Sequence, residues 1–269
     1  MNPSVLFVFI LSALLGVLRA ADLAFGTDAV TGLCTVGSVW WRYLALGIVV
    51  LAAVLVGRTQ PSRSEAVRSR RPLAGILAFV GAVCFLAAAG AQIALGAASG
   101  LGGFVRCILE CLCSAWLSTI GRCWLSPNEW KKPFGGLYLA VAGSLLFYWN
   151  VLLRFMENSS SWHRVEPTAM VWQMLAALVF LSAMVRALWL PETSNGCQLC
   201  EAGICTFLLC FCWELPRVLV LLFHGITAAD LPEVLFGFGM CCIGALGLFT
   251  VARVAGSDGR PAIPRHAVG

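Results

Sequence analysis

Long apolar runs separated by short polar segments dominate the chain. A helix needs roughly 20 apolar residues to cross a bilayer core about 30 Å thick. Eight runs meet or approach this length, at residues 3–20, 40–56, 73–97, 104–125, 134–156, 169–190, 198–223 and 233–254. None shows the two-residue alternation of membrane strands. The pattern therefore predicts an all-α, polytopic transmembrane bundle of about eight spans that occupies residues 1–255.

The composition agrees with a lipid-covered exterior. Hydrophobic residues make up 60% of the 269 residues and charged residues only 12%, whereas soluble domains carry about 25% charged residues. The net charge of +5 resides mainly in segments between apolar runs, which argues against nucleic-acid binding and leaves the bilayer as the expected partner. A membrane-protein partner or a second copy of the chain stays open. Lysine occurs only at Lys131 and Lys132, and this preference for arginine favours a GC-rich, prokaryotic source.

Basic residues predict the orientation in the membrane. The linker at residues 57–72 contains Arg58, Arg63, Arg68, Arg70 and Arg71, and loops rich in arginine stay in the cytoplasm. With eight spans, both termini then lie in the cytoplasm of a cell (inner or plasma) membrane, and residues 256–269 form a disordered cytoplasmic tail. The run at 104–125 contains three charges, and if it did not span, everything after it would invert.

Aromatic residues near the run ends suggest the membrane interface. Trp40 and Trp41 begin the second run, and Trp124 ends the fourth. Tryptophan is enriched at both membrane–water boundaries, so we expect all three side chains to face the headgroups.

Two stretches of three runs have similar layouts. Residues 73–156 and 169–254 share the motifs Phe85-Leu-Ala-Ala and Phe180-Leu-Ser-Ala. Three helices per copy would invert the second copy, as in many secondary transporters. One interpretation is thus an inverted three-helix repeat. The alternative is chance similarity between segments rich in alanine and leucine.

Charges inside the apolar runs are the first candidates for a site, because a charge at the bilayer centre is costly and usually faces protein or water. Arg106 and Glu110 are spaced to pair on one helix, as are Glu214 and Arg217. Pro216 between the latter two is expected to kink or break the seventh span, and broken helices build many transporter sites. The alternative is that Arg106 reaches the interface and the other charges form structural ion pairs.

Buried amides are expected nearby as interhelical hydrogen-bond partners. Gln92, Asn150 and Gln173 lie within apolar runs, where such side chains commonly hold helices together.

Cysteines are the second candidates. Cys197 and Cys200 form a C-x-x-C pair at a membrane edge, a spacing that suits a redox dithiol or half of a metal site. The alternative is that these and the other membrane cysteines pack as small apolar side chains. No motif identifies a catalytic residue or a cofactor, so no enzyme activity is assigned. The leading hypothesis is a small-solute or ion transporter, or a transporter subunit. The alternatives are a non-transporting assembly, sensing or partner-binding protein, and a membrane thiol redox or metal-handling protein.

Overall fold

The computed structural model describes residues 2–28, 33–60, 65–98, 100–126, 133–156, 165–190, 195–225 and 227–256. Within these ranges eight helical spans are long and apolar enough to cross a membrane, which confirms the all-α bundle. They are α1 (Pro3–Phe25), α2 (Val39–Arg58), α3 (Pro72–Ala94), α4 (Gly100–Leu125), α5 (Gly136–Met156), α6 (Val165–Trp189), a composite of α7 (Gly196–Thr206), η2 (Phe207–Trp213) and α8 (Glu214–His224), and α9 (Leu231–Val254). Apart from Gly256, the tail predicted to be disordered lies outside the described residues.

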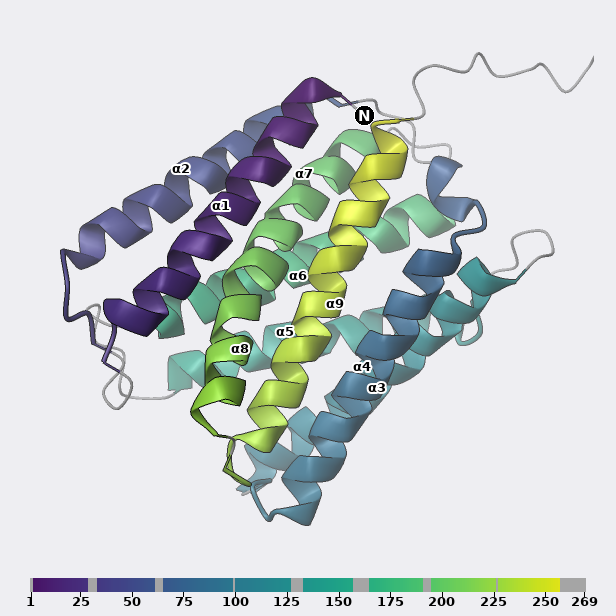
Figure 1. Ribbon diagram of the computed structural model, residues 1–269. Helices are drawn as coiled ribbons and strands as arrows, with labels where there is room; N and C mark the ends of the chain where they lie inside the picture. The colour runs from purple at the N-terminus through teal and green to yellow at the C-terminus, as the bar shows by residue number, and fades with distance from the viewer. Residues whose placement is uncertain are drawn as a thin grey trace, which may run out of the picture.

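The spans form two rows (Figure 1). α2, α1, the α7–α8 span, α9 and α3 lie side by side in the front row, with α6, α5 and α4 behind them. Eight passes bring the start of α1 and the end of α9 to one end of the bundle, which we call the terminal end. The opposite end, where α1 ends and α9 begins, is called the cavity end.

Span α9 occupies the centre. In its most apolar stretch 72% of the residues are buried, against 22% for α2 at the edge of the bundle. Phe236 of α9 packs edge-on against Phe85 of α3, with ring centroids 5.4 Å apart, and Phe85 packs in the same way on Phe147 of α5. This aromatic cluster therefore joins three spans through the middle of the bundle.

Small residues let α9 approach its neighbour closely. A Cβ atom added to Gly247 would lie 2.5 Å from the carbonyl oxygen of Gly203 on α7. Lipid tails are as apolar as leucine, so close backbone packing is a main source of helix association in membranes. Glycine at position 247 is therefore required by the contact between α7 and α9.

The tryptophans divide into two groups. Trp40 and Trp41 are exposed, as an interfacial position requires. Trp124 is fully buried, and its indole Nε1 donates a hydrogen bond to the carbonyl oxygen of Val67, 3.1 Å away. Trp124 therefore does not face outward, because this side chain holds the linker before α3 against the end of α4.

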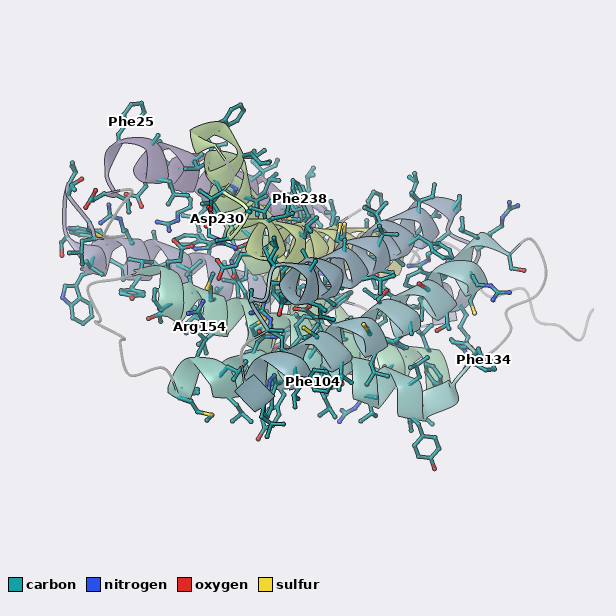
Figure 2. The ribbon with its side chains drawn as sticks, turned by 90° about the horizontal axis from the view of Figure 1, so that it is seen from below. Phe25, Phe104, Phe134, Arg154, Asp230 and Phe238 are labelled. Carbon is teal, nitrogen blue, oxygen red and sulfur yellow. The ribbon has the colours of Figure 1, made fainter. Side chains whose placement is uncertain are left out.

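Large apolar side chains cover the exterior. Seen from below the view of Figure 1, Phe25 and Phe134 point away from the bundle (Figure 2), and both are more than four-fifths exposed. Such a surface suits lipid rather than water. The chain is a multi-pass membrane protein.

The seventh span is helical throughout residues 196–223, so the break expected at Pro216 is not found. The irregularity lies one turn earlier, in the π-helical segment η2. Pro216 has no N–H to donate to the carbonyl of Cys212, four residues before it. A Cβ atom at Gly16 of α1 would lie 2.6 Å from that same carbonyl oxygen. The helix thus continues through the proline, and α1 packs closely against the carbonyl oxygen of Cys212.

Candidate functional site

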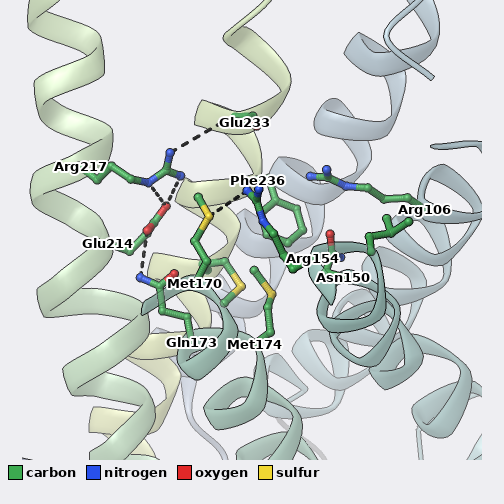
Figure 3. Close-up of a pocket in the computed structure, with 12 residues that line it drawn as sticks. Arg106, Asn150, Arg154, Met170, Gln173, Met174, Glu214, Arg217, Glu233 and Phe236 are labelled. Carbon is green, nitrogen blue, oxygen red and sulfur yellow. Dashed lines mark hydrogen bonds and ion pairs between the residues drawn. The ribbon is translucent and has the colours of Figure 1, made fainter. Parts of the chain in front are cut away.

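Three of the four charged residues of the two predicted pairs, Arg106, Glu214 and Arg217, line one cavity of about 120 Å³ in the cavity-end half of the bundle. Five spans supply its walls: α4, α5, α6, α8 and α9 (Figure 3). The polar and sulfur-containing lining residues are Arg106, Asn150, Arg154, Met170, Gln173, Met174, Glu214, Arg217, Glu233 and Met240. Charged side chains from distant parts of the sequence, Arg106 on α4 and Glu214 and Arg217 on α8, therefore face the same space.

On the α8 side, Glu214 is held from two directions. Arg217, one turn later on α8, pairs with it, with Nε 3.0 Å from Oε1. Gln173 of α6 donates from Nε2 to Oε2 of Glu214 over 3.0 Å and to the carbonyl oxygen of Leu209 over 3.2 Å. The expected pairing of Glu214 with Arg217 is confirmed, as is the expected interhelical role of Gln173.

Helix α9 packs closely against the carboxylate of Glu214. A Cβ atom at Gly237 of α9 would lie 2.8 Å from Oε1 of Glu214. Glycine at position 237 therefore gives the carboxylate its space beside α9, and a larger residue there would displace it.

On the α4 side, Glu110 is fully buried and accepts from two residues. Nε of Arg106 lies 2.9 Å from Oε1 of Glu110, as the four-residue spacing predicted. Nε2 of Gln92 on α3 donates to both carboxylate oxygens over 2.9 and 3.0 Å. The guanidinium of Arg106 also lies over the ring of Phe236, 4.9 Å from its centroid. Arg106 is therefore held by an ion pair and a cation–π contact, and does not simply extend to the interface.

Asn150 differs from the other two amides. Its Nδ2 donates to the carbonyl oxygen of Leu146 in its own helix, over 2.8 Å, while the residue lines the cavity. The interhelical bond expected for Asn150 is not what holds this side chain.

The ion pairs continue from the cavity toward α1 and α2. Nε of Arg217 lies 3.3 Å from Oε1 of Glu166, and Nη2 of Arg19 lies 3.9 Å from Oε2 of the same carboxylate. Arg19 pairs in turn with Asp22, which also accepts two bonds of 2.9 Å from Nε of Arg42. The guanidinium of Arg19 lies 4.8 Å from the ring centroid of Trp213, the last residue of η2. The π-helical segment is therefore held next to this network.

The carboxylates lie deep in the bundle. Glu110 is ten residues after the start of α4, and Glu214 ten residues before the end of α8, so each lies roughly 15 Å along its helix. That depth is about half of a 30 Å bilayer core. Exposure falls toward the interior on the α8–α9 side: the side chain of Glu233 is 55% exposed, that of Arg217 11% and that of Glu214 4%. The polar groups thus form a path from the cavity end inward.

The charges around the cavity are divided between its two sides. Arg106 and Arg154 lie on α4 and α5, with Glu110 as the acidic partner of Arg106. Glu214, Glu233 and Glu166 surround Arg217 on the other side. The α4–α5 wall is therefore the more positive and the α8–α9 wall the more negative, which suits a small polar solute or an ion.

The C-x-x-C pair lies far from this cavity, at the terminal end. Sγ of Cys197 donates to the carbonyl oxygen of Gln60, 2.8 Å away, and Cys200 is buried. In the described part of the chain no three histidine, cysteine or acidic residues cluster as a metal site. The structure therefore offers no complete metal site at this pair, and a redox role for Cys197 and Cys200 stays a prediction.

Sequence reasoning missed Arg19, Asp22, Arg42, Glu166 and Glu233. Arg19 and Asp22 have the three-residue spacing of Glu214 and Arg217, and this signal could have identified them. The first apolar run was predicted to end at residue 20, but α1 continues to Phe25, and within it Asp22 is neutralised by Arg19.

Comparison of the chain with known proteins identifies no relative. No family model, no curated protein and no solved structure matches the chain. The fold and the cavity define it as a multi-pass helical membrane protein with a charged cavity inside the bundle.

Proposed function

We propose that the chain carries a small polar solute or an ion across its membrane, and that the solute binds in the cavity between α4, α5, α6, α8 and α9. The observation that carries the proposal is that one cavity inside the bundle is lined by the Glu214–Arg217 pair and by Arg106, whose partner Glu110 is buried behind it. Charges inside a membrane are costly, and where they occur they commonly mark a solute or ion pathway.

Two further features support transport. The decreasing exposure from Glu233 to Glu214 provides access from the cavity end, while the bundle beyond the cavity is closed by buried apolar residues such as Trp116 and Leu117. The π-helical segment precedes Glu214 directly, and π segments within α-helices recur at functional sites. The proposed state is thus open toward the cavity end and closed toward the terminal end.

The inverted repeat of residues 73–156 and 169–254 belongs to the same proposal. One charged pair falls in each half, on α4 and on α8, and transporter sites commonly form where two such repeats meet.

We further propose that the terminal end faces the cytoplasm. The described arginines at that end include Arg58, Arg68, Arg71 and Arg253, in accord with the positive-inside rule. A membrane-impermeant maleimide applied to intact cells should label a variant whose only cysteine is Cys34, at the cavity end, and should not label one whose only cysteine is Cys197. The reverse labelling would overturn this orientation.

The transport proposal is tested by ligand-dependent stability followed by uptake. Purified protein is heated with amino acids, small carboxylates, amines and inorganic ions, because a ligand at 100 times its Kd stabilises the folded state by about 2.7 kcal/mol. A hit should raise the Tm of the wild type and of Arg253→Gln, an exposed arginine at the terminal end, but not that of Glu214→Gln. The hit should then enter proteoliposomes that contain the wild type.

Two outcomes would overturn the proposal. Equal stabilisation of Glu214→Gln and the wild type would place binding elsewhere. Binding without uptake would favour the non-transporting alternative, a sensing or partner-binding protein.

A further inference from the structure

A second cavity, of about 880 Å³, lies along the outer side of the bundle between α2, α6 and α7. We call it the lateral groove. Its α6 wall contains Trp172, Leu175, Val179, Ser182 and Arg186, which recur every three or four residues and so share one helix face. Leu175 and Val179 are 44% and 56% exposed. The groove therefore opens sideways to lipid, and it is separate from the charged cavity.

The shape of the groove follows from two contacts of α2. Toward the cavity end, Oη of Tyr43 donates to Oγ1 of Thr168 on α6 over 3.2 Å, so α2 and α6 meet there. Toward the terminal end, α2 turns to α7: a Cβ atom at Gly57 would lie 2.4 Å from Cα of Glu201. The groove is thus closed at one end by Tyr43 and has α7 as its floor.

The charged residues that line the groove lie at its terminal end. Arg186, Gln198 and Glu201 line it there, and Arg58 approaches Glu201 with Nε 3.6 Å from Oε2. In the portion of the chain that the structure describes, Arg186 has no ion-pair partner and is exposed. Two arginines and one glutamate leave a positive excess at this end.

Its length suits a lipid tail. Trp172 and Arg186 are fourteen residues apart on α6, or roughly 21 Å along the helix axis. One leaflet of a bilayer core measures about 15 Å, so an extended acyl chain can lie along this wall with its headgroup at Arg186.

We propose that the lateral groove binds one anionic phospholipid, with the phosphate at Arg186 and Arg58 and an acyl chain along Val179 and Leu175 toward Trp172. Basic pockets between spans on the cytoplasmic side are known to hold anionic headgroups. The exposed Arg186 beside Arg58 favours an anionic headgroup over an apolar partner helix, and such a helix is an outcome that the test below distinguishes. This site does not depend on the proposed transport.

The test is native mass spectrometry of the purified protein with phosphatidylglycerol and phosphatidylcholine of identical acyl chains. The wild type should retain one phosphatidylglycerol in preference to phosphatidylcholine. Arg186→Gln should reduce that preference about fivefold, since one arginine near an anionic surface contributes about 1 kcal/mol. Val179→Trp should fill the groove and remove the bound lipid whatever its headgroup.

Matched controls lie outside the groove. Arg253→Gln removes an exposed arginine at the same end, and Val83→Trp enlarges an exposed apolar residue of α3. Both should bind lipid as the wild type does. Equal retention of the two lipids by the wild type, or an unchanged adduct in Val179→Trp, would overturn the proposal. So would a stoichiometric membrane-spanning polypeptide that co-purifies with the wild type and is lost in Val179→Trp.

A measurement in bilayers keeps the test decisive if Val179→Trp does not fold. Dibrominated phosphatidylglycerol should quench the fluorescence of the wild type more than dibrominated phosphatidylcholine does, and this difference should vanish in Trp172→Phe. Quenching that is independent of the headgroup in the wild type would contradict an anionic-lipid site.

Discussion

The charged cavity and the lateral groove lie against two faces of the same helix, α6. Gln173 and Met174 face the cavity, whereas Trp172, Leu175 and Val179 face the groove. On the cavity side Gln173 is bonded to Glu214 on another span, so removing one of the two leaves the other buried without that partner. On the groove side Leu175 and Val179 are 44% and 56% exposed. The first face therefore contributes to the stability of the bundle, whereas the phospholipid that we propose for the second face can exchange.

The largest loss of stability is expected for Arg217→Leu, on the cavity side. It removes the cation that neutralises Glu214, a side chain only 4% exposed. Leaving one member of a buried pair uncompensated costs about 3–5 kcal/mol. We expect a loss of this size in the free energy of unfolding, measured by denaturant titration in mixed micelles. The double variant Glu214→Leu/Arg217→Leu should lose less than the single one, and a larger loss would show that the pair itself is not the source of the effect.

Next in size is Gln173→Leu on the cavity face of α6. It deprives Oε2 of Glu214 and the carbonyl oxygen of Leu209 of their donor, and an unsatisfied buried acceptor costs about 1–3 kcal/mol. Thermal unfolding should show the loss. The matched change on the other face is Leu175→Ala, which removes a half-exposed side chain and should shift the Tm clearly less. Equal shifts would mean that the two faces of α6 do not differ.

A smaller effect is expected for Tyr43→Phe, which removes the hydrogen bond to Thr168 at the closed end of the groove. The net value of such a bond is about 0.5–1.5 kcal/mol. We expect a loss of stability in this range, together with faster exchange of bound lipid, followed by dilution of a fluorescent phosphatidylglycerol. Thr168→Val should reproduce both effects, whereas a change in solute binding at the cavity would contradict the separation of the two sites.

The smallest change in stability is predicted for Arg186→Gln. Surface substitutions away from special contacts usually stay within about 0.5 kcal/mol, and Arg186 is exposed. The Tm in lipid-free detergent should therefore match that of the wild type. A loss as large as that of Gln173→Leu would show that the groove face also contributes to the stability of the fold.

The sequence was sufficient for the spans and for local pairs. Eight apolar runs predicted eight helices, and the spacing of Arg106 with Glu110 and of Glu214 with Arg217 predicted their ion pairs. These features depend on helix period and length, which are local properties of the chain.

That Arg106 lines the same cavity as Glu214 and Arg217 was not predictable, because it depends on how α4 and α8 pack around α9. The groove was hidden for a different reason. Leu175 and Val179 are the same residue types as those that face lipid elsewhere, so composition cannot separate a groove wall from an outer surface. Trp124 shows the same limit, since a tryptophan near a helix end can lie at the interface or, as here, in the core.

The π-helical segment η2 has a genetic meaning as well as a structural one. Successive residues of an α-helix are rotated by about 100°, and π-helical turns accommodate additional residues within an α-helix. If residues 207–213 were strictly α-helical and α7 kept its place, Glu214 would be rotated away from Gln173. Inserting or deleting a single codon within residues 207–213 would therefore change which way the charged half of this helix faces. For such a span, insertions and deletions are as consequential as substitutions, and reading-frame-preserving indels are where diverging copies of this gene would gain or lose the site.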